Sequence, residues 1–227
     1  MQKRLIAVAV FFAALLVVLT HIGTKVVATP VFSYAEEQKC VYLTFDDGPS
    51  TVVTNRILDT LAEEQVKATF FIVSDRALSR KDTLRRIAKE GHTIGVHSKT
   101  HEYNQIYASD QSLLKDIDDC AAVIRNVTGV NPRVYRFPGG GTKDRARQSK
   151  LIREKGYEII GWNAVCGDEE IANASAETLF QTTVKTSAGK NKVVLLCHDS
   201  AYRKTTAEAL PRIIAYFREQ GYEFRAF

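Results

Sequence analysis

The sequence predicts an α/β protein built on parallel strands, from two observations. Short apolar runs rich in β-branched and aromatic residues alternate along the chain with stretches whose apolar residues recur at helical spacing. Glycine follows four of the helix-like stretches, where a left-handed residue commonly ends a helix: Gly91, Gly129, Gly156 and Gly221. Alternation of this kind is typical of parallel sheets whose strands are joined by helical crossovers.

Seven strands and six helices are expected in chain order. The strands are expected at 41–45, 68–73, 93–96, 134–137, 157–162, 192–197 and 222–226, and the helices at 53–64, 83–90, 112–127, 144–155, 176–187 and 206–220. In the third of these helices, Leu113, Ile117 and Ile124 lie on one stripe, as a core-facing helix requires. Alternation alone leaves an open sheet and a closed barrel as alternatives, and in both the reactive groups gather at the carboxyl ends of the strands.

Composition indicates one globular domain. The chain has 227 residues, of which 45% are hydrophobic and 25% charged, and the part after the leader, 36–227, is long enough for a full core. The net charge of +5 comes from scattered basic residues, with no basic block interleaved with aromatics. We therefore expect that the protein does not bind nucleic acid. We also expect it to be a monomer.

The N-terminal segment 1–35 predicts export. Lys3 and Arg4 precede an uninterrupted apolar run, 5–19, which Thr20 and His21 then end. The run is long for the core of a signal peptide and short for a membrane span, so a cleaved signal peptide and an uncleaved membrane anchor, each with a short linker, stay open. Both place the rest of the chain outside the cytoplasm, in contact with a membrane only through this segment.

The four cysteines are expected to be unpaired and buried. Cys40, Cys120, Cys166 and Cys197 could form disulfides in an exported protein. Their spacing resembles neither a zinc site nor a dense disulfide framework.

Two adjacent carboxylates, Asp46 and Asp47, follow the first strand. Pro49 ends the strand, because proline has no N–H to continue a ladder. Side chains alternate along a strand, so both carboxylates can face one point only if the chain turns here. Asp-Gly is also common in ordinary turns, so this motif alone does not identify a site.

Two histidines, His97 and His101, follow the third strand. A spacing of four residues is typical of metal ligands on one face of a helical turn. Ser98 stands where the helical zinc-protease motif needs a glutamate, so that motif is excluded. An isolated pair of this kind is more often solvated or part of a core.

Three later strands also end in polar residues. Arg136 stands at the end of the fourth, Asp168 follows the fifth, and His198 follows the sixth, with Leu196 on the same face. Taken with the earlier motifs, the strand ends supply two histidines and one carboxylate for a divalent metal with an open water position. A second Asp for a base and a third His for an acid complete the residues needed for metal-assisted hydrolysis of an acyl bond.

These motifs resemble those of the NodB-like polysaccharide deacetylases, carbohydrate esterase family four. The resemblance covers Gln38 to Phe227, and its five motifs stand in order at the predicted strand ends. It implies a distorted (β/α)7 barrel. It also implies that Asp46 is the catalytic base and that Asp47, His97 and His101 are the metal ligands.

The remaining roles follow from the same resemblance. Arg136 and Asp168 would orient the base, His198 would be the general acid, and Leu196 would line the acetyl pocket. The backbone N–H of Gly139 would donate to the oxyanion.

Three positions depart from the family pattern. Gly139 replaces a tyrosine, which removes an aromatic wall but keeps the backbone N–H. Val165 replaces the first of two aspartates, and Glu169 replaces the tryptophan that follows the second, so a sugar platform is lost there. Cys166 has no role in the pattern.

The resemblance implies zinc, with cobalt as the alternative, and an N-acetylated polysaccharide such as peptidoglycan or a chitin-like polymer of N-acetylglucosamine. Two other functions stay open: cleavage of O-acetyl esters on xylan-type chains, and a catalytically silent carbohydrate-binding barrel. The presence of Asp46, Arg136 and His198 argues against the silent barrel, because binding alone needs none of them. The sequence does not name the polymer.

Overall fold

The computed structural model of the protein describes residues 38–141 and 145–227, and its centre is a sheet of eight strands whose pairs are all parallel. The strands are β1 (Cys40–Asp46), β2 (Thr69–Val73), β3 (Thr93–Ser98), β4 (Val134–Tyr135), β5 (Glu158–Ile159), β6 (Ala164–Val165), β7 (Lys192–His198) and β8 (Glu223–Arg225). The predicted leader, 1–35, lies outside the described residues. Within them, no helix has the length and apolar character needed to cross a membrane.

Strand β1 lies at the centre of the sheet, whose order is β5-β4-β3-β2-β1-β7-β6. On one side β1 pairs with β7 over its whole length, so Asp46 and His198 are register partners. Its other edge is shared, because β8 pairs with Cys40–Tyr42 and β2 pairs from Thr44 onward. The polar strand ends predicted from the sequence therefore meet at one edge of the sheet.

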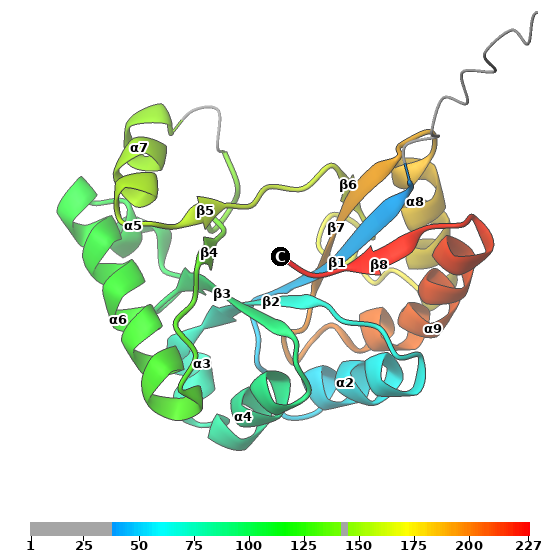
Figure 1. The fold of residues 1–227 in the computed structure, drawn as a ribbon, viewed down its shortest axis with the longest axis horizontal. Helices are drawn as coiled ribbons and strands as arrows, with labels where there is room; N and C mark the ends of the chain where they lie inside the picture. The colour runs from blue at the N-terminus through cyan, green and yellow to red at the C-terminus, as the bar shows by residue number, and fades with distance from the viewer. Residues whose placement is uncertain (1–37, 142–144) are drawn as a thin grey trace, which may run out of the picture. The chain divides into compact units, whose positions relative to one another are not determined.

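The sheet curls, and the helices lie along the outside of the curl (Figure 1). They are α2 (Val53–Glu63), α3 (Ser74–Leu78), α4 (Lys81–Lys89), α5 (Tyr103–Ile106), α6 (Asp110–Thr128), α7 (Ala146–Glu154), α8 (Ala176–Ser187) and α9 (Lys204–Glu219). Among the described residues no backbone pairing joins β5 to β6, so the curl stays open between these two strands.

Three short elements were not expected from the sequence. Strand β6 has two residues, and helices α3 and α5 have five and four. Elements this short hold little more than one period, so their apolar residues cannot recur often enough to give a detectable pattern. The strand predicted at 157–162 is real only at Glu158–Ile159, and the sheet resumes at β6.

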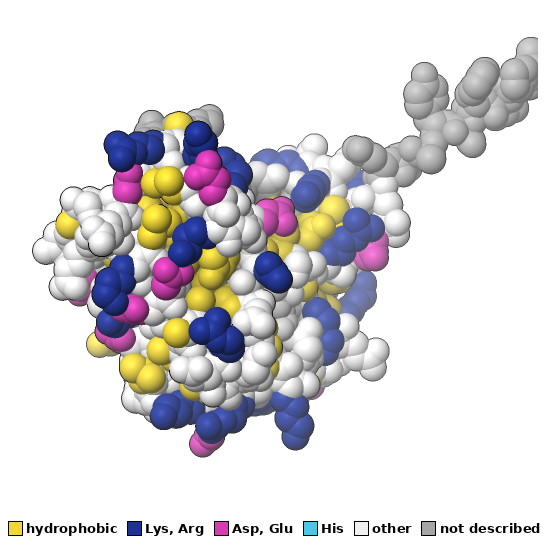
Figure 2. Space-filling model, turned by 60° about the vertical axis from the view of Figure 1, so that its left-hand side comes forward, with side chains coloured by type: hydrophobic (Ala, Val, Ile, Leu, Met, Phe, Trp, Pro, Cys, Tyr) yellow, Lys and Arg dark blue, Asp and Glu magenta, His cyan; other side chains and the backbone are white. Residues whose placement is uncertain are grey.

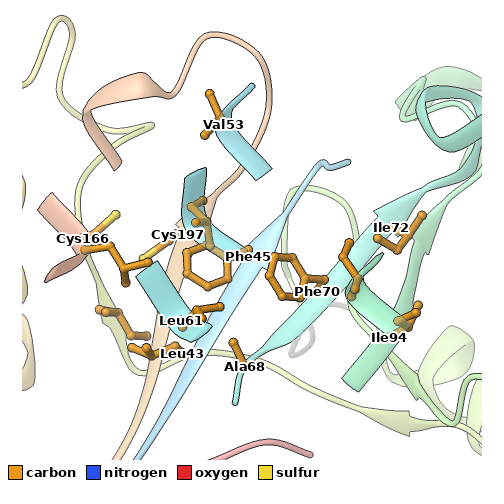
Figure 3. Close-up of a cluster of buried hydrophobic side chains, with 14 of the residues drawn as sticks. Leu43, Phe45, Val53, Leu61, Ala68, Phe70, Ile72, Ile94, Cys166 and Cys197 are labelled. Carbon is orange, nitrogen blue, oxygen red and sulfur yellow. The ribbon is translucent and has the colours of Figure 1, made fainter. Parts of the chain in front are cut away.

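The alternation of side chains divides the core between the two faces of the sheet. Leu43 and Phe45 of β1 pack with Phe70 and Ile72 of β2 in the main core beneath the helices (Figure 3). Phe71, which lies between these two residues of β2 and points to the other face, belongs to a second and smaller cluster. The C-terminal residue Phe227 packs against that cluster, and Figure 1 shows the C-terminal end inside the curl.

Cysteines and surface charge agree with the sequence analysis. All four cysteines are buried and none forms a disulfide within the described residues. On the face drawn in Figure 2, Lys and Arg side chains are scattered among acidic and other residues without forming a continuous patch.

Candidate active site

The two carboxylates at the end of β1 face one cleft because the backbone reverses at the second. Asp47 has a φ of 76°, in the left-handed region that side chains other than glycine rarely adopt. This reversal brings Asp46 and Asp47 to the same side, which an extended strand would not do. At the next residue, a Cβ on Gly48 would clash with the buried carboxylate of Asp199, so this turn requires glycine.

Asp199 lies behind this turn and is fully buried. Burial raises its pKa to about 7, against the opposing effect of a hydrogen bond from the Thr54 hydroxyl to its Oδ2. The negative charges of nearby Asp47 and Asp46 raise the pKa of Asp199 further.

The two histidines come from β3 and the loop after it. His101 also has a left-handed backbone, with φ 67°. The loop is held by Asp116 of α6, which accepts hydrogen bonds from the Ser98 hydroxyl at 3.2 Å and the Lys99 N–H at 3.0 Å. Ser98 Oγ in turn accepts the N–H of His101 at 2.9 Å. Residues in sparsely populated conformations often lie at functional sites, where neighbouring contacts hold them.

Asp47, His97 and His101 can hold a divalent metal. Their candidate ligand atoms all lie within 4.8 Å of one another. Asp47 Oδ1 lies 3.1 Å from His101 Nε2 and 3.6 Å from His97 Nε2. The same oxygen is buried and has no hydrogen-bond partner among the described residues, as expected of an atom that binds an ion.

The protonation of both imidazoles suits this role. His97 Nδ1 lies 2.9 Å from the carbonyl oxygen of Arg136, so this nitrogen carries the proton and Nε2 has a free lone pair. Burial lowers the pKa of His101, which keeps its ring neutral. The donor set of two imidazoles and one carboxylate fits zinc and similar ions.

Asp46 is held by a fully buried arginine. Arg136 NH1 donates to Asp46 Oδ1 and to the Thr44 hydroxyl, each at 2.8 Å. Its other nitrogens donate to the carbonyls of Ile160 and Gly161, at 3.1 and 3.0 Å. All the contacts of this guanidinium are therefore made within the protein, and it holds one oxygen of Asp46 beside a positive charge.

His198 lies between two carboxylates. Its Nδ1 is 2.8 Å from Asp168 Oδ1, and its Nε2 is 3.0 Å from Glu169 Oε2. Burial by itself lowers the pKa of His198, but the hydrogen bonds to Asp168 and Glu169 and the charges of Asp168 and Asp46 outweigh it and raise the pKa to about 11. The imidazole is therefore protonated at neutral pH.

The position of Asp168 differs from the expectation. We expected it to help Arg136 orient Asp46, but its carboxylate contacts His198 instead. One oxygen is bound to His198 Nδ1, and the other accepts the His198 N–H and the Thr206 hydroxyl, both at 2.7 Å. The order of strands explains this, because β6, which leads to Asp168, lies beside β7 and not beside β1.

A cleft of about 110 Å³ joins these groups. Gly139 and Leu196 line it, together with residues already described and with Tyr103, Phe137, Trp162, Glu169 and Glu170. Tyr103 of α5 was not anticipated. A Cβ at Gly139 would come within 3.1 Å of its hydroxyl, so Tyr103 supplies an aromatic side chain beside the position where the family pattern has a tyrosine.

Arg76 of α3 is a second residue that sequence reasoning missed. It donates to the backbone carbonyl of Asp47 at 2.6 Å and so supports the left-handed turn. No sequence signal identified it, because α3 is too short to show a period.

Comparison with known proteins gives the family. The family model for polysaccharide deacetylase matches residues 33–160. The chain belongs to the polysaccharide deacetylase family. A peptidoglycan-N-acetylglucosamine deacetylase of Bacillus cereus is 32% identical over 188 residues, which are 82% of this chain and 85% of the relative. The putative polysaccharide deacetylase YheN of Bacillus subtilis is 34% identical over 190 residues, and the match spans 82% of this chain and 66% of that protein.

Solved structures of the same family have the same fold as this chain. The catalytic domain of a peptidoglycan N-acetylglucosamine deacetylase from Eubacterium rectale has a TM-score of 0.75 and 33% identity, over 83% of this chain and 88% of that one. A Streptococcus mutans CE4 esterase has a TM-score of 0.76 and 31% identity, over 83% and 86%. The predicted α/β fold of a distorted (β/α)7 barrel is therefore confirmed, in the form of a curled sheet that stays open on one side.

Proposed function

We propose that this protein is a metal-dependent hydrolase that removes acetyl groups from an N-acetylated polysaccharide. One observation carries the proposal: a three-residue metal site, a carboxylate beside an arginine and a protonated histidine all line one small cleft. A carbohydrate-binding surface needs none of these groups, whereas hydrolysis of an amide needs a base, an acid and a polarised carbonyl.

Asp47, His97 and His101 are the proposed metal ligands, with zinc favoured and cobalt as the alternative. When bound, a divalent cation at this site polarises the acetyl carbonyl and lowers the pKa of water. Every other requirement of the reaction falls to residues of the chain.

Asp46 is the proposed base that takes a proton from the attacking water, and Arg136 holds its second oxygen so that the free one faces the cleft. The Gly139 N–H donates to the oxyanion, and Leu196 packs against the acetyl methyl group. His198 gives its Nε2 proton to the leaving nitrogen, and Asp168 orients and charges this ring through Nδ1.

The relatives support an N-acetylated cell-wall polymer as substrate. Three of the four reported above are named for peptidoglycan N-acetylglucosamine or for polysaccharide in general. We propose peptidoglycan or a chitin-like polymer for this chain, outside the cytoplasm. Segment 1–35 would then act as a signal peptide or a membrane anchor, and 36–227 as a monomeric catalytic domain.

Cleavage of O-acetyl esters on xylan-type chains is the second candidate. The Streptococcus mutans neighbour is named an esterase, and an alkoxide leaves more easily than an amine, so the same groups would suffice. The amide is favoured because a protonated acid such as His198 is needed for a nitrogen leaving group far more than for an oxygen one.

Acetate release tests the proposal. The purified protein is incubated with N-acetylglucosamine oligomers, with peptidoglycan and with acetylated xylan, each with and without an excess of chelator. We expect release from the N-acetylated substrates, loss in chelator, and recovery when zinc or cobalt is restored. Full activity in chelator would contradict the metal role, and release from xylan alone would favour the esterase.

A further inference from the structure

Glu169 stands beside the proposed acid at a position where the family pattern has a tryptophan. Its Oε2 lies 3.0 Å from Nε2 of His198, and its side chain is 56% exposed while that of His198 is 6% exposed. Both residues line the catalytic cleft. A carboxylate therefore takes the place of an aromatic surface within contact of the group that delivers the proton.

Only one nitrogen of His198 is available to substrate. Asp168 holds Nδ1 from the buried side, so proton transfer must use Nε2. Any atom that hydrogen-bonds to Nε2 lies about 3 Å from it. Glu169 Oε2 contacts Nε2 from the cleft, so a leaving atom that takes the Nε2 proton must replace this contact and lie beside the carboxylate.

The two kinds of acetyl group differ at this atom. An acetamido nitrogen carries an N–H, which donates a hydrogen bond, whereas the bridging oxygen of an acetyl ester carries no hydrogen. An ionised carboxylate is a strong acceptor for the first and has nothing to accept from the second.

We propose that Glu169 is a specificity-determining residue that accepts the N–H of the acetamido group and thereby favours N-acetyl over O-acetyl substrates. This inference rests on the proposed function and assigns the preference that the cleft alone leaves open. A site that hydrogen-bonds a substrate N–H discriminates against an analogue that lacks it, because the analogue forgoes this hydrogen bond in the transition state.

The transfers of protons and the breaking of the C–N bond are consistent with Glu169 beside the leaving nitrogen. Water adds its oxygen to the acetyl carbon while one proton passes to Asp46. The C–N bond then breaks, its electron pair stays on nitrogen, and the proton on His198 Nε2 moves to that nitrogen. The products are a free amine and acetic acid, which loses its O–H proton to solvent to become acetate. Asp46 gives up its proton and His198 takes one up, both by exchange with solvent, before the next cycle. When the amine takes up a further proton from solvent, the ammonium pairs with Glu169.

The alternative is that Glu169 affects the reaction only through its ion pair with His198, which keeps the acid protonated. Removing it would then weaken the acid for every nitrogen leaving group, whether or not that nitrogen carries a hydrogen. A substrate whose acetamido nitrogen bears a methyl group separates these readings, because it still needs the acid but has no N–H to donate.

The test compares Glu169→Ala with Glu208→Ala in the full chain loaded with zinc. Glu208 is a carboxylate of α9 that is 47% exposed, pairs with Arg56 and does not line the cleft, so it is a control for the loss of one negative charge. The value of kcat/KM is measured on an N-acetylglucosamine oligomer, on its N-methyl analogue and on an O-acetylated sugar oligomer.

We expect Glu169→Ala to lower kcat/KM on the N-acetyl oligomer by roughly 10- to 100-fold, the effect of a hydrogen bond to a charged group. Values on the N-methyl and O-acetyl substrates should change by less than about 2-fold, because Asp168 still holds Nδ1 of His198 and keeps the ring protonated, and Glu208→Ala should leave all three unchanged. Equal losses on the N-acetyl and N-methyl substrates, or no loss on either, would overturn the inference alone. A wild-type protein that releases acetate from none of the substrates would overturn the proposed function, and this inference with it.

Discussion

Asp46 and His198 face the same cleft with opposite charges. Arg136 holds Asp46 by a hydrogen bond of 2.8 Å, and two carboxylates keep His198 protonated. An amine is a far worse leaving group than a phenolate, so the acid matters for an N-acetyl sugar and little for an aryl acetate.

We therefore expect Asp46→Asn to abolish activity on both kinds of substrate. His198→Ala should lose roughly 10²–10⁴-fold on the N-acetyl sugar, the usual contribution of a general acid, and keep much of its aryl-acetate activity. Steady-state kinetics on both substrates measures the difference. Metal content, measured in parallel, should be unchanged in both variants because neither residue is a proposed ligand; equal losses of His198→Ala on the two substrates would remove the acid assignment.

Asp168 acts on the acid through Nδ1. In Asp168→Asn the charge is lost, so the pKa of His198, now about 11, should fall, and activity on the N-acetyl sugar should be lost at lower pH than in the parent. At neutral pH we expect kcat to drop by roughly 10²-fold, with a smaller change in KM. The measurement is the pH profile of kcat, since a purely structural role would not move its alkaline limb.

Thr206→Val is the matched control for this variant. It removes the hydroxyl that donates to Asp168 Oδ2 but leaves the carboxylate. Its alkaline limb should stay near that of the parent. The pair of His198 and Asp168 also contributes to the stability of the fold. Because the pKa of His198 is raised in the folded state, this contribution is complete below about pH 6.5 and is lost as the pH rises through about 11. An Asp168→Asn profile identical to the parent's would mean that this carboxylate does not set the acid.

At the scale of elements, helix α6 positions the loop that carries His101. Asp116 is the point of attachment, through Ser98 and Lys99. In Asp116→Ala the left-handed backbone at His101 loses its support, and we expect zinc affinity to fall by roughly 10- to 100-fold, as is typical when a residue that orients a ligand is removed. Titration of the metal-free protein with zinc measures this.

Asp118→Ala on the same helix is the comparison. Its side chain is exposed and pairs with Lys155, away from the loop. Zinc affinity should be unchanged in this variant. If both variants bound zinc as the parent does, the loop would not depend on α6.

At the scale of the whole molecule, we expect the free energy of unfolding to depend on the hydrophobic core and not on the metal site. Phe70 is fully buried and packs on Phe45 with ring centroids 5.2 Å apart. We expect Phe70→Ala to lower the free energy of unfolding by ~3–5 kcal/mol, because a large buried side chain leaves a cavity. Tyr202→Ala, at a residue that is 94% exposed, should change it by less than about 0.5 kcal/mol.

Denaturant unfolding measures both variants. The same experiment on the parent in excess chelator should show a cooperative transition at a similar midpoint, because the core contains no metal ligand. Unfolding of the parent by chelator alone would show that the metal is needed for the fold as well as for activity.

Much of the site could be predicted from local sequence. Asp46, Asp47, His97, Arg136 and His198 stand at or directly after strand ends, and apolar periodicity finds most of those strands. Parallel strands bring their carboxyl ends to one edge, so the sequence determined which side chains would meet. The long helices were also predicted closely, because each contains several turns of apolar repeat.

Only the tertiary structure decided how these residues are partnered. Asp168 contacts His198 and not Asp46 because β6 lies beside β7, and the order of strands is set by pairing between distant segments. Tyr103 and Glu169 line the cleft from a short helix and a loop, and Arg76 of another short helix contacts Asp47; segments this short carry no periodic signal. Sequence periodicity reports which face of an element is buried, whereas contacts between elements depend on their packing, and local pattern does not contain that information.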